Sequence, residues 1–219
     1  MDVSNILVKA VMILVPMILS LSVHEYAHAR VAYWLGDDTA SRMGRLTLNP
    51  LSHIDLFGTI LLPLISISTG FSLFGWAKPV PVSPYRLTRK MTMYKGMVLV
   101  AVAGPLSNLV LAIVCGLVLH ALGATGAAAP RNAEAAGVFL TMVFFMNIGL
   151  AVFNMLPVPP LDGSRLLPPA LQEKMQRYTL LVFIGFLVLF NVGANLLIWP
   201  IQLIAGAVLY LTGLPFGVG

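Results

Sequence analysis

Long stretches of this chain contain no charged side chain, and the charged residues are confined to the segments between them. The uncharged runs cover residues 10–23, 97–122, 135–161 and 178–219. The last three are longer than the roughly 20 apolar residues that a helix needs to cross a bilayer. The pattern therefore predicts an all-α polytopic membrane protein.

The first run is too short to cross a membrane by itself. Its 14 residues, 10–23, would form about 21 Å of helix at ~1.5 Å per residue, whereas the hydrocarbon core is ~30 Å thick. The span must therefore continue through HEYAH, residues 24–28. This places two histidines and a glutamate inside a membrane helix.

Composition agrees with an integral membrane protein. Of the 219 residues, 58% are hydrophobic and 10% are charged, and the mean hydropathy is +0.92, which is far from the composition of a soluble domain. We expect no cleavable signal peptide, because Asp2 precedes Lys9 and no small-x-small pattern precedes His24. The net charge is +5, but the basic residues lie between apolar runs, where positive charge ordinarily marks the cytoplasmic side of a membrane. Nucleic acid is therefore not a predicted partner.

The histidine pair in HEYAH has the spacing of a metal site. His24 and His28 share one helix face, because residues four apart lie one above the other. With Glu25 between them they form the HExxH pattern, in which two imidazoles bind one zinc ion and the glutamate handles protons. Ionisable groups within a membrane are costly and usually functional. The segment therefore predicts a metal centre.

A catalytic zinc ion needs a third protein ligand and keeps a fourth position for water. The metzincin extension is excluded, because Val31 and Trp34 stand where it requires glycine and histidine. The other candidates are His53, Asp55, His120, Glu134, Asp162 and Glu173. Asp162 is favoured, since the prolines just before it open the backbone at membrane depth, which is tolerated around a buried or wet site. His53 and Asp55 are expected beside the ligands or in a structural role, and His53 is the alternative third ligand.

Three motifs occur in a fixed order, each in an apolar segment: HEYAH at 24–28, AGPLSN at 103–108 and NMLPVPPLDG at 154–163. Together they resemble the site-2 protease family of intramembrane zinc metalloproteases, over nearly the whole chain. The chain looks like a minimal form of that family, without a PDZ or other appended soluble domain.

The resemblance implies a site built from these motifs. One catalytic Zn²⁺ would be held by His24, His28 and Asp162, with Glu25 as the general base. The resemblance also implies that Asn154 contacts the substrate backbone or the oxyanion, and we give Asn108 the same expected role. An ordinary interhelical hydrogen bond is the alternative role for Asn154.

The ligand assignment constrains the topology. If HEYAH and Asp162 lie at one depth, their two spans run in the same direction, so only one of the apolar stretches 56–76 and 97–122 crosses between them. The first stretch is interrupted by glycine and proline and is expected to be re-entrant or partly extended. In that arrangement 11 of the 13 Lys and Arg residues lie on one side, against 9 if the stretch crosses. Because such residues collect in the cytoplasm, we predict an active site toward the cytoplasmic side of the cell membrane.

The predicted fold is a single domain over residues 1–219, with about five to six membrane segments and a small β element. The expected parts are an HExxH helix at about 5–35, a strand and re-entrant region at 43–76, a span at 95–122, an LDG-bearing span at 135–163 and one or two spans at 178–213. The strand is GRLTLNP, 44–50, which alternates apolar and polar residues. Its residues Leu46, Thr47 and Leu48 are predicted to pair with an unwound substrate by strand addition, with a structural hairpin as the alternative. The segment KPVPVSP, 78–84, is predicted to be an extended, polyproline-like connector.

The predicted reaction is hydrolysis of a peptide bond within or near a transmembrane helix of a protein substrate in the lipid bilayer. Zinc activates water and polarises the scissile carbonyl, while Glu25 moves the proton from the water to the leaving amine. The alternative is a non-proteolytic metal-binding protein, either a transporter or a pseudoprotease chaperone. A transporter needs polar groups along a full transmembrane path, whereas here they cluster at one depth. A pseudoprotease is expected to have lost Glu25, which this chain retains. Both comparisons favour the protease. The sequence predicts no oligomeric state.

Overall fold

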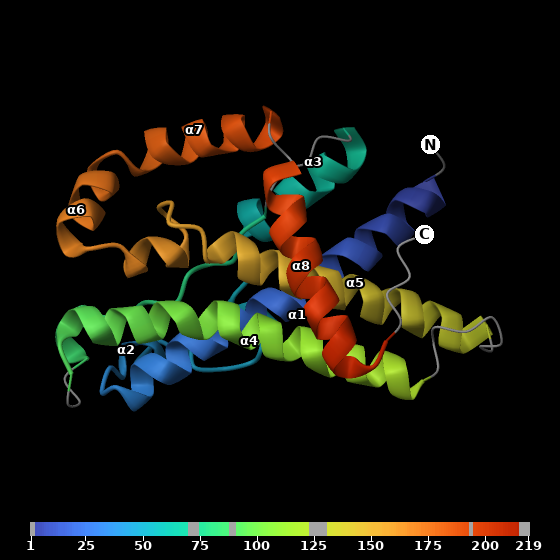
Figure 1. The fold of residues 1–219 in the computed structure, drawn as a ribbon, viewed down its shortest axis with the longest axis horizontal. Helices are drawn as coiled ribbons and strands as arrows, with labels where there is room; N and C mark the ends of the chain where they lie inside the picture. The colour runs from blue at the N-terminus through green and yellow to red at the C-terminus, as the bar shows by residue number, and fades with distance from the viewer. Residues whose placement is uncertain (1–2, 70–74, 88–90, 123–130, 193–194, 215–219) are drawn as a thin grey trace.

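The structure, a computed structural model, describes residues 3–69, 75–87, 91–122, 131–192 and 195–214. Its centre consists of three long helices, α1 (Val3–Trp34), α4 (Met93–Ala121) and α5 (Arg131–Asn154). α1 and α5 run in the same direction, and α4, which packs against both, runs the opposite way (Figure 1). The two helices that carry or precede the predicted ligands are therefore parallel, as the ligand assignment requires.

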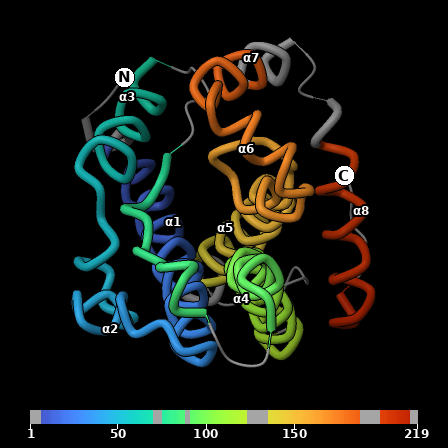
Figure 2. Tube along the Cα trace, turned by 90° about the vertical axis from the view of Figure 1, so that its left-hand side faces the viewer, coloured from blue at the N-terminus to red at the C-terminus, as the bar shows by residue number. Residues whose placement is uncertain are grey.

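Shorter elements surround this bundle. In chain order they are α2 (Thr39–Arg42), η1 (Pro50–Ser52), η2 (Leu56–Leu61), α3 (Leu62–Thr69), η3 (Pro84–Arg86), η4 (Asp162–Leu166), α6 (Pro169–Arg177), α7 (Thr179–Val192) and α8 (Asn195–Thr212). Figure 2 shows α2 and α3 on the α1 side of the bundle and α8 on the opposite side, where it packs against α4 and α5.

Small side chains hold the three long helices together. Helices in lipid gain little from the hydrophobic effect, so close packing of small residues is what favours their association. Ala29 and Ala32 of α1 and Ala101 of α4 are buried. On the far side of α4, a Cβ added to Gly116 would lie 2.8 Å from Thr212 Cγ2, so α8 approaches α4 equally closely. The α4, α5 and α8 core consists of Ala112, Cys115, Val143, Phe144, Ile148, Val152, Ala205 and Val208.

Three helices in the described part of the chain are long and apolar enough to cross a membrane, over Leu7–Trp34, Met93–Ala121 and Ala135–Asn154. The predicted number of five to six segments is not confirmed. The helical stretch Leu56–Thr69 and the helix over Ile198–Thr212 are apolar but shorter. The described part of this membrane protein is thus all-helical and contains three candidate spans.

The predicted β element is not found, because the described residues contain no strand, and residues 44–50 are among them. A strand needs a neighbour that accepts and donates its backbone hydrogen bonds. Two backbone N–H groups of this segment instead bond to nearby residues. Arg45 N–H donates to the Ala40 carbonyl at 2.8 Å, and Asn49 N–H donates to Thr47 Oγ1 at 3.1 Å. The alternating pattern gives a single segment without a partner strand.

Candidate metal centre

The HEYAH segment lies in the C-terminal half of α1, facing the interior of the bundle. His24, Glu25 and His28 are 4%, 9% and 8% exposed. The helix continues through them to Trp34, so the i, i+4 spacing places both imidazoles on the face that α4 covers. The expected histidine face is therefore present and buried.

Asp162 reaches the same point from the turn that follows α5. The helix ends at Asn154, and after a stretch that contains Pro157, Pro159 and Pro160 the chain enters η4 at Asp162. Gly163 allows this turn to fold back, since a Cβ there would lie 2.2 Å from the Met155 carbonyl oxygen. The turn thus returns the carboxylate toward α1.

Three ligand atoms converge at this point. His24 Nε2 and His28 Nε2 are 2.9 Å apart, and Asp162 Oδ2 lies 3.1 Å from the first and 3.3 Å from the second. A tetrahedral ion such as Zn²⁺, with bonds of ~2.0–2.1 Å, holds its ligand atoms roughly 3.3–3.4 Å apart. These three residues form the one group of His, Cys and acidic side chains in the described part of the chain that could hold a metal ion.

Hydrogen bonds on the far side of each ring orient both imidazoles. His28 Nδ1 lies 2.7 Å from the Val100 carbonyl oxygen, and His24 Nδ1 lies 2.6 Å from Asn108 Oδ1. An amide or backbone carbonyl oxygen only accepts, so each Nδ1 carries the hydrogen and each Nε2 presents a lone pair. This is the arrangement that metal-binding histidines normally have.

Gly104 of α4 makes room for this cluster. A Cβ added there would lie 2.4 Å from His28 Nε2 and 2.6 Å from His24 Nε2. The glycine of the AGPLSN motif therefore lets α4 approach the imidazoles, and the neighbouring Asn108 lies one turn further along the same face.

Replacing Gly104 with alanine is expected to weaken metal binding by about tenfold or more, because both rings must move away from the shared point. Metal affinity is measured by competition with a chelator of known strength. Gly149→Ala on α5 is the matched control, since an added methyl group there meets nothing within 4 Å. Equal weakening in the two variants contradicts the steric explanation.

Glu25 is held by a segment that sequence reasoning did not connect with it. Of the predicted connector, 78–84, residues 78–83 have neither helix nor strand, and Pro84 begins η3. Its Val80 N–H donates to Glu25 Oε2 at 2.8 Å. The prolines predict an extended connector here, but they do not predict its contact with α1. No local pattern marks a contact between residues so far apart in sequence.

Further hydrogen bonds fix the connector along its length. Lys78 N–H donates to the His53 carbonyl at 2.9 Å, and the Arg45 guanidinium donates to the Lys78 carbonyl at 2.5 Å. At the other end, Ser83 N–H donates to the buried carboxylate of Asp37 at 2.6 Å. The connector is therefore a fixed part of the site.

The remaining predicted residues lie around the ligand group. His53 is buried and its Nε2 donates to the Thr47 carbonyl at 2.8 Å, and Asp55 caps η2. Asn154 donates from Nδ2 to the Leu150 carbonyl in its own helix at 3.0 Å. Two other ligand candidates, His120 and Glu173, are exposed, and the side chain of Glu134 lies outside the described residues.

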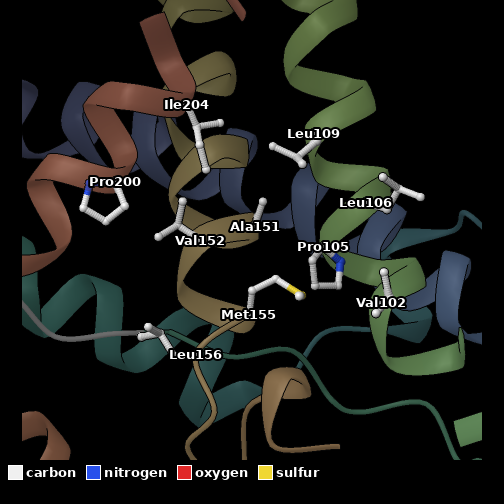
Figure 3. A pocket seen from close by; sticks show the side chains of 10 residues that line it. All are labelled: Val102, Pro105, Leu106, Leu109, Ala151, Val152, Met155, Leu156, Pro200 and Ile204. Carbon is white, nitrogen blue, oxygen red and sulfur yellow. The ribbon is translucent and has the colours of Figure 1, made fainter. Parts of the chain in front are cut away.

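An apolar cavity of about 360 Å³ lies on the side of α4 that faces away from the metal centre (Figure 3). Residues of α4, of the end of α5 and the two positions after it, and of α8 line the cavity. They are Val102, Pro105, Leu106, Leu109, Ala151, Val152, Met155, Leu156, Pro200 and Ile204. Gly104 and Asn108 contact α1 side chains, whereas Pro105, Leu106 and Leu109 line the cavity. The polar metal centre and this apolar space thus occupy different faces of α4.

Comparisons with known proteins agree with this geometry. Residues 121–192, which include Asp162, match the family described as Peptidase family M50. The chain is 42% identical over 196 residues to "Putative zinc metalloprotease YwhC" of Bacillus subtilis, covering 86% of this chain and 84% of that protein. It is 31% identical over 167 residues to "Putative zinc metalloprotease Rip2" of Mycolicibacterium smegmatis and of Mycobacterium tuberculosis, covering 76% of this chain and 60% of each relative. No solved structure matches.

Proposed function

The chain belongs to peptidase family M50 and is an intramembrane zinc metalloprotease, and on that premise we propose which bonds it cleaves and which residues cleave them. The substrates are membrane proteins, hydrolysed at peptide bonds within or near their transmembrane helices. One observation carries the proposal: His24 Nε2 and His28 Nε2, on a helix that is apolar enough to cross a membrane, converge with Asp162 Oδ2 from η4.

We assign zinc binding to His24, His28 and Asp162. The donor set of two imidazoles and one carboxylate leaves the fourth tetrahedral position for water or substrate. When bound, zinc supplies a Lewis acid that polarises the scissile carbonyl and lowers the pKa of water. The hydrogen bonds at both Nδ1 atoms support the assignment, because they leave both Nε2 lone pairs directed at the ion.

We assign the general base to Glu25. Val80 N–H holds Oε2, so the carboxylate has a fixed orientation and Oε1 is the oxygen that takes the proton. A water proton moves to Oε1 as the water oxygen attacks the carbonyl carbon. The same proton then passes to the amine nitrogen as the C–N bond breaks, so that Glu25 returns to its starting charge.

Removal of zinc should abolish cleavage reversibly. The purified protein in detergent is expected to cut a model transmembrane substrate, to stop after treatment with 1,10-phenanthroline and dialysis, and to recover when Zn²⁺ is added, because catalysis depends on the Lewis acid. Cleavage is followed on gels and zinc content by elemental analysis. Cleavage that persists in protein shown to be free of zinc contradicts the proposal.

We propose that the active site faces the cytoplasm of the cell. The support is the parallel direction of α1 and α5 (Figure 1) together with the distribution of Lys and Arg, of which 11 of 13 fall on one side when the stretch 56–76 does not cross. Residues 56–69 of that stretch form η2 and α3, of 6 and 8 residues. Together they are shorter than a span needs to be.

We also propose that the substrate pairs with the backbone of Leu46 and Leu48. In the described structure neither residue's N–H or C=O has a backbone partner, and the side chain of Leu48 is exposed. Thr47 differs, because its carbonyl accepts from His53. An unwound substrate would supply the partner strand that the chain itself lacks. Asn154, half-buried at the end of α5, is proposed to contact the substrate backbone or the oxyanion.

The variant Leu48→Pro tests this pairing, since proline removes one N–H donor. Loss of one hydrogen bond, worth about 0.5–1.5 kcal/mol, should raise KM by up to about tenfold, while kcat and zinc content stay near native values. Leu48→Ala keeps the N–H and is the control. If both variants behave alike, the side chain matters and the backbone pairing does not.

A further inference from the structure

A chain of buried hydrogen bonds runs behind His24 and connects three helices. Asn108 of α4, Asn147 of α5 and Ser20 of α1 are all 0% exposed. Asn108 Oδ1 lies 2.6 Å from His24 Nδ1, and its Nδ2 donates to Asn147 Oδ1 at 2.7 Å and to the Ser20 carbonyl at 3.3 Å. Asn147 Nδ2 donates to Ser20 Oγ at 2.8 Å and to the Val143 carbonyl at 2.8 Å.

Asn147 is not one of the residues assigned to the metal centre. It lies outside the three sequence motifs and makes no hydrogen bond to a metal ligand or to Glu25. Two fully buried amides at this depth are costly unless their polar atoms are satisfied. Here every amide oxygen and nitrogen of the pair has a partner, so the pair is a built feature of the bundle.

The direction of each hydrogen bond follows from one anchor. The Val143 carbonyl only accepts, so it turns Asn147 Nδ2 toward itself and directs Asn147 Oδ1 at α4. That oxygen also only accepts, so it turns Asn108 Nδ2 toward α5 and directs Asn108 Oδ1 at His24. If Asn108 were flipped, two amide oxygens would face each other and an NH₂ group would face His24 Nδ1.

The orientation of Asn108 in turn sets the tautomer of His24. An oxygen at 2.6 Å from Nδ1 requires the hydrogen on Nδ1, which leaves the lone pair on Nε2, the atom that faces His28 and Asp162. We propose that Asn147 is a positioning residue that acts through Asn108 to hold His24 in its metal-binding tautomer and orientation. The inference rests on the proposed role of His24 as a zinc ligand.

The test measures metal binding rather than cleavage. Asn147→Leu is expected to weaken Zn²⁺ affinity by about 10- to 100-fold, the usual effect of losing a partner behind a metal ligand, and to alter the visible spectrum of the Co²⁺-substituted protein. The melting temperature of the metal-free protein reports folding separately. Thr141→Val is the matched control, because Thr141 also lies on α5 and its hydroxyl bonds only to the Gly137 carbonyl of its own helix.

Rescue by a conservative variant separates positioning from simple loss of packing. Asn147→Asp keeps an oxygen for Asn108 and, through a carboxyl O–H, can keep a donor for Val143 or Ser20, so it should recover most of the affinity and the native Co²⁺ spectrum. If Asn147→Leu does not fold, Asn147→Thr replaces it, since its hydroxyl is too short to direct Asn108 and the same loss is expected.

The outcomes are distinct. Native affinity and spectrum in the leucine variant, or in the threonine variant where leucine does not fold, overturn the inference. Weaker Zn²⁺ binding in these variants that Asn147→Asp does not restore also overturns the inference, because loss of packing alone would then explain the loss of affinity. A native protein that binds no Zn²⁺ overturns the proposed zinc site itself, and the inference with it.

Discussion

Replacing Glu25 with glutamine should reduce kcat/KM for a transmembrane substrate by roughly 100- to 10,000-fold, the range that positioned general bases contribute. Zinc content should stay at the native level, because Glu25 is not among the three converging ligand atoms. Glutamine has nearly the same shape, and its amide oxygen can still accept from Val80 N–H. The variant therefore removes the basic oxygen with little disturbance of the connector.

The measurement pairs single-turnover cleavage in detergent with elemental analysis of zinc. Glu25→Ala is the comparison variant, because it also removes the acceptor for Val80 N–H and should add a loss of connector order to the loss of the base. Cleavage by Glu25→Gln at the native rate would remove Glu25 from the mechanism. Loss of zinc together with activity would mean that Glu25 supports the metal site instead.

The parts of this site that sequence predicts well are the local ones. The i, i+4 relation of His24 and His28 follows from helix geometry alone, and both lie on one buried face. Asp162 was predicted because prolines before it stop the helix, and the carboxylate does lie beside both imidazoles. These features need no knowledge of which helices pack together.

The parts that sequence missed depend on contacts between distant segments. Val80 meets Glu25 across 55 positions, and Asn147 meets Asn108 across 39. Neither leaves a periodic pattern, since a backbone N–H exists in nearly every residue and a single asparagine in an apolar helix has many possible partners. Asn108 was expected near the substrate, whereas its amide atoms are engaged with His24 and the helices behind it.

The β element shows the opposite error, in which a local pattern predicted too much. Alternation in residues 44–50 satisfies one requirement of a strand, but the described chain supplies no second segment to pair with it. The pattern remains informative, because it leaves the backbone groups of Leu46 and Leu48 free of backbone partners. That is the property on which the proposed substrate pairing depends.

Replacing Asp162 with alanine should abolish cleavage and weaken zinc binding. Hydrogen-bond partners of metal ligands already contribute about 10- to 100-fold to affinity, so loss of a ligand itself is expected to exceed about 100-fold. Alanine removes Oδ2, which lies 3.1 Å and 3.3 Å from the two imidazole nitrogens, and leaves an ion with two protein ligands. Zinc affinity is measured by chelator competition, beside cleavage of the same substrate used for Glu25→Gln.

Asp38→Asn is the matched control for Asp162→Ala, because Asp38 is a carboxylate paired with Arg42 and Arg86 at the protein surface. Full zinc occupancy is expected there. Full occupancy in Asp162→Ala would instead direct attention to His53, whose buried Nδ1 has no partner in the described structure. His53 Nε2 is already engaged by the Thr47 carbonyl, so that alternative requires Nδ1 to be the ligand atom. His53→Ala made in the Asp162→Ala background would then lose the zinc.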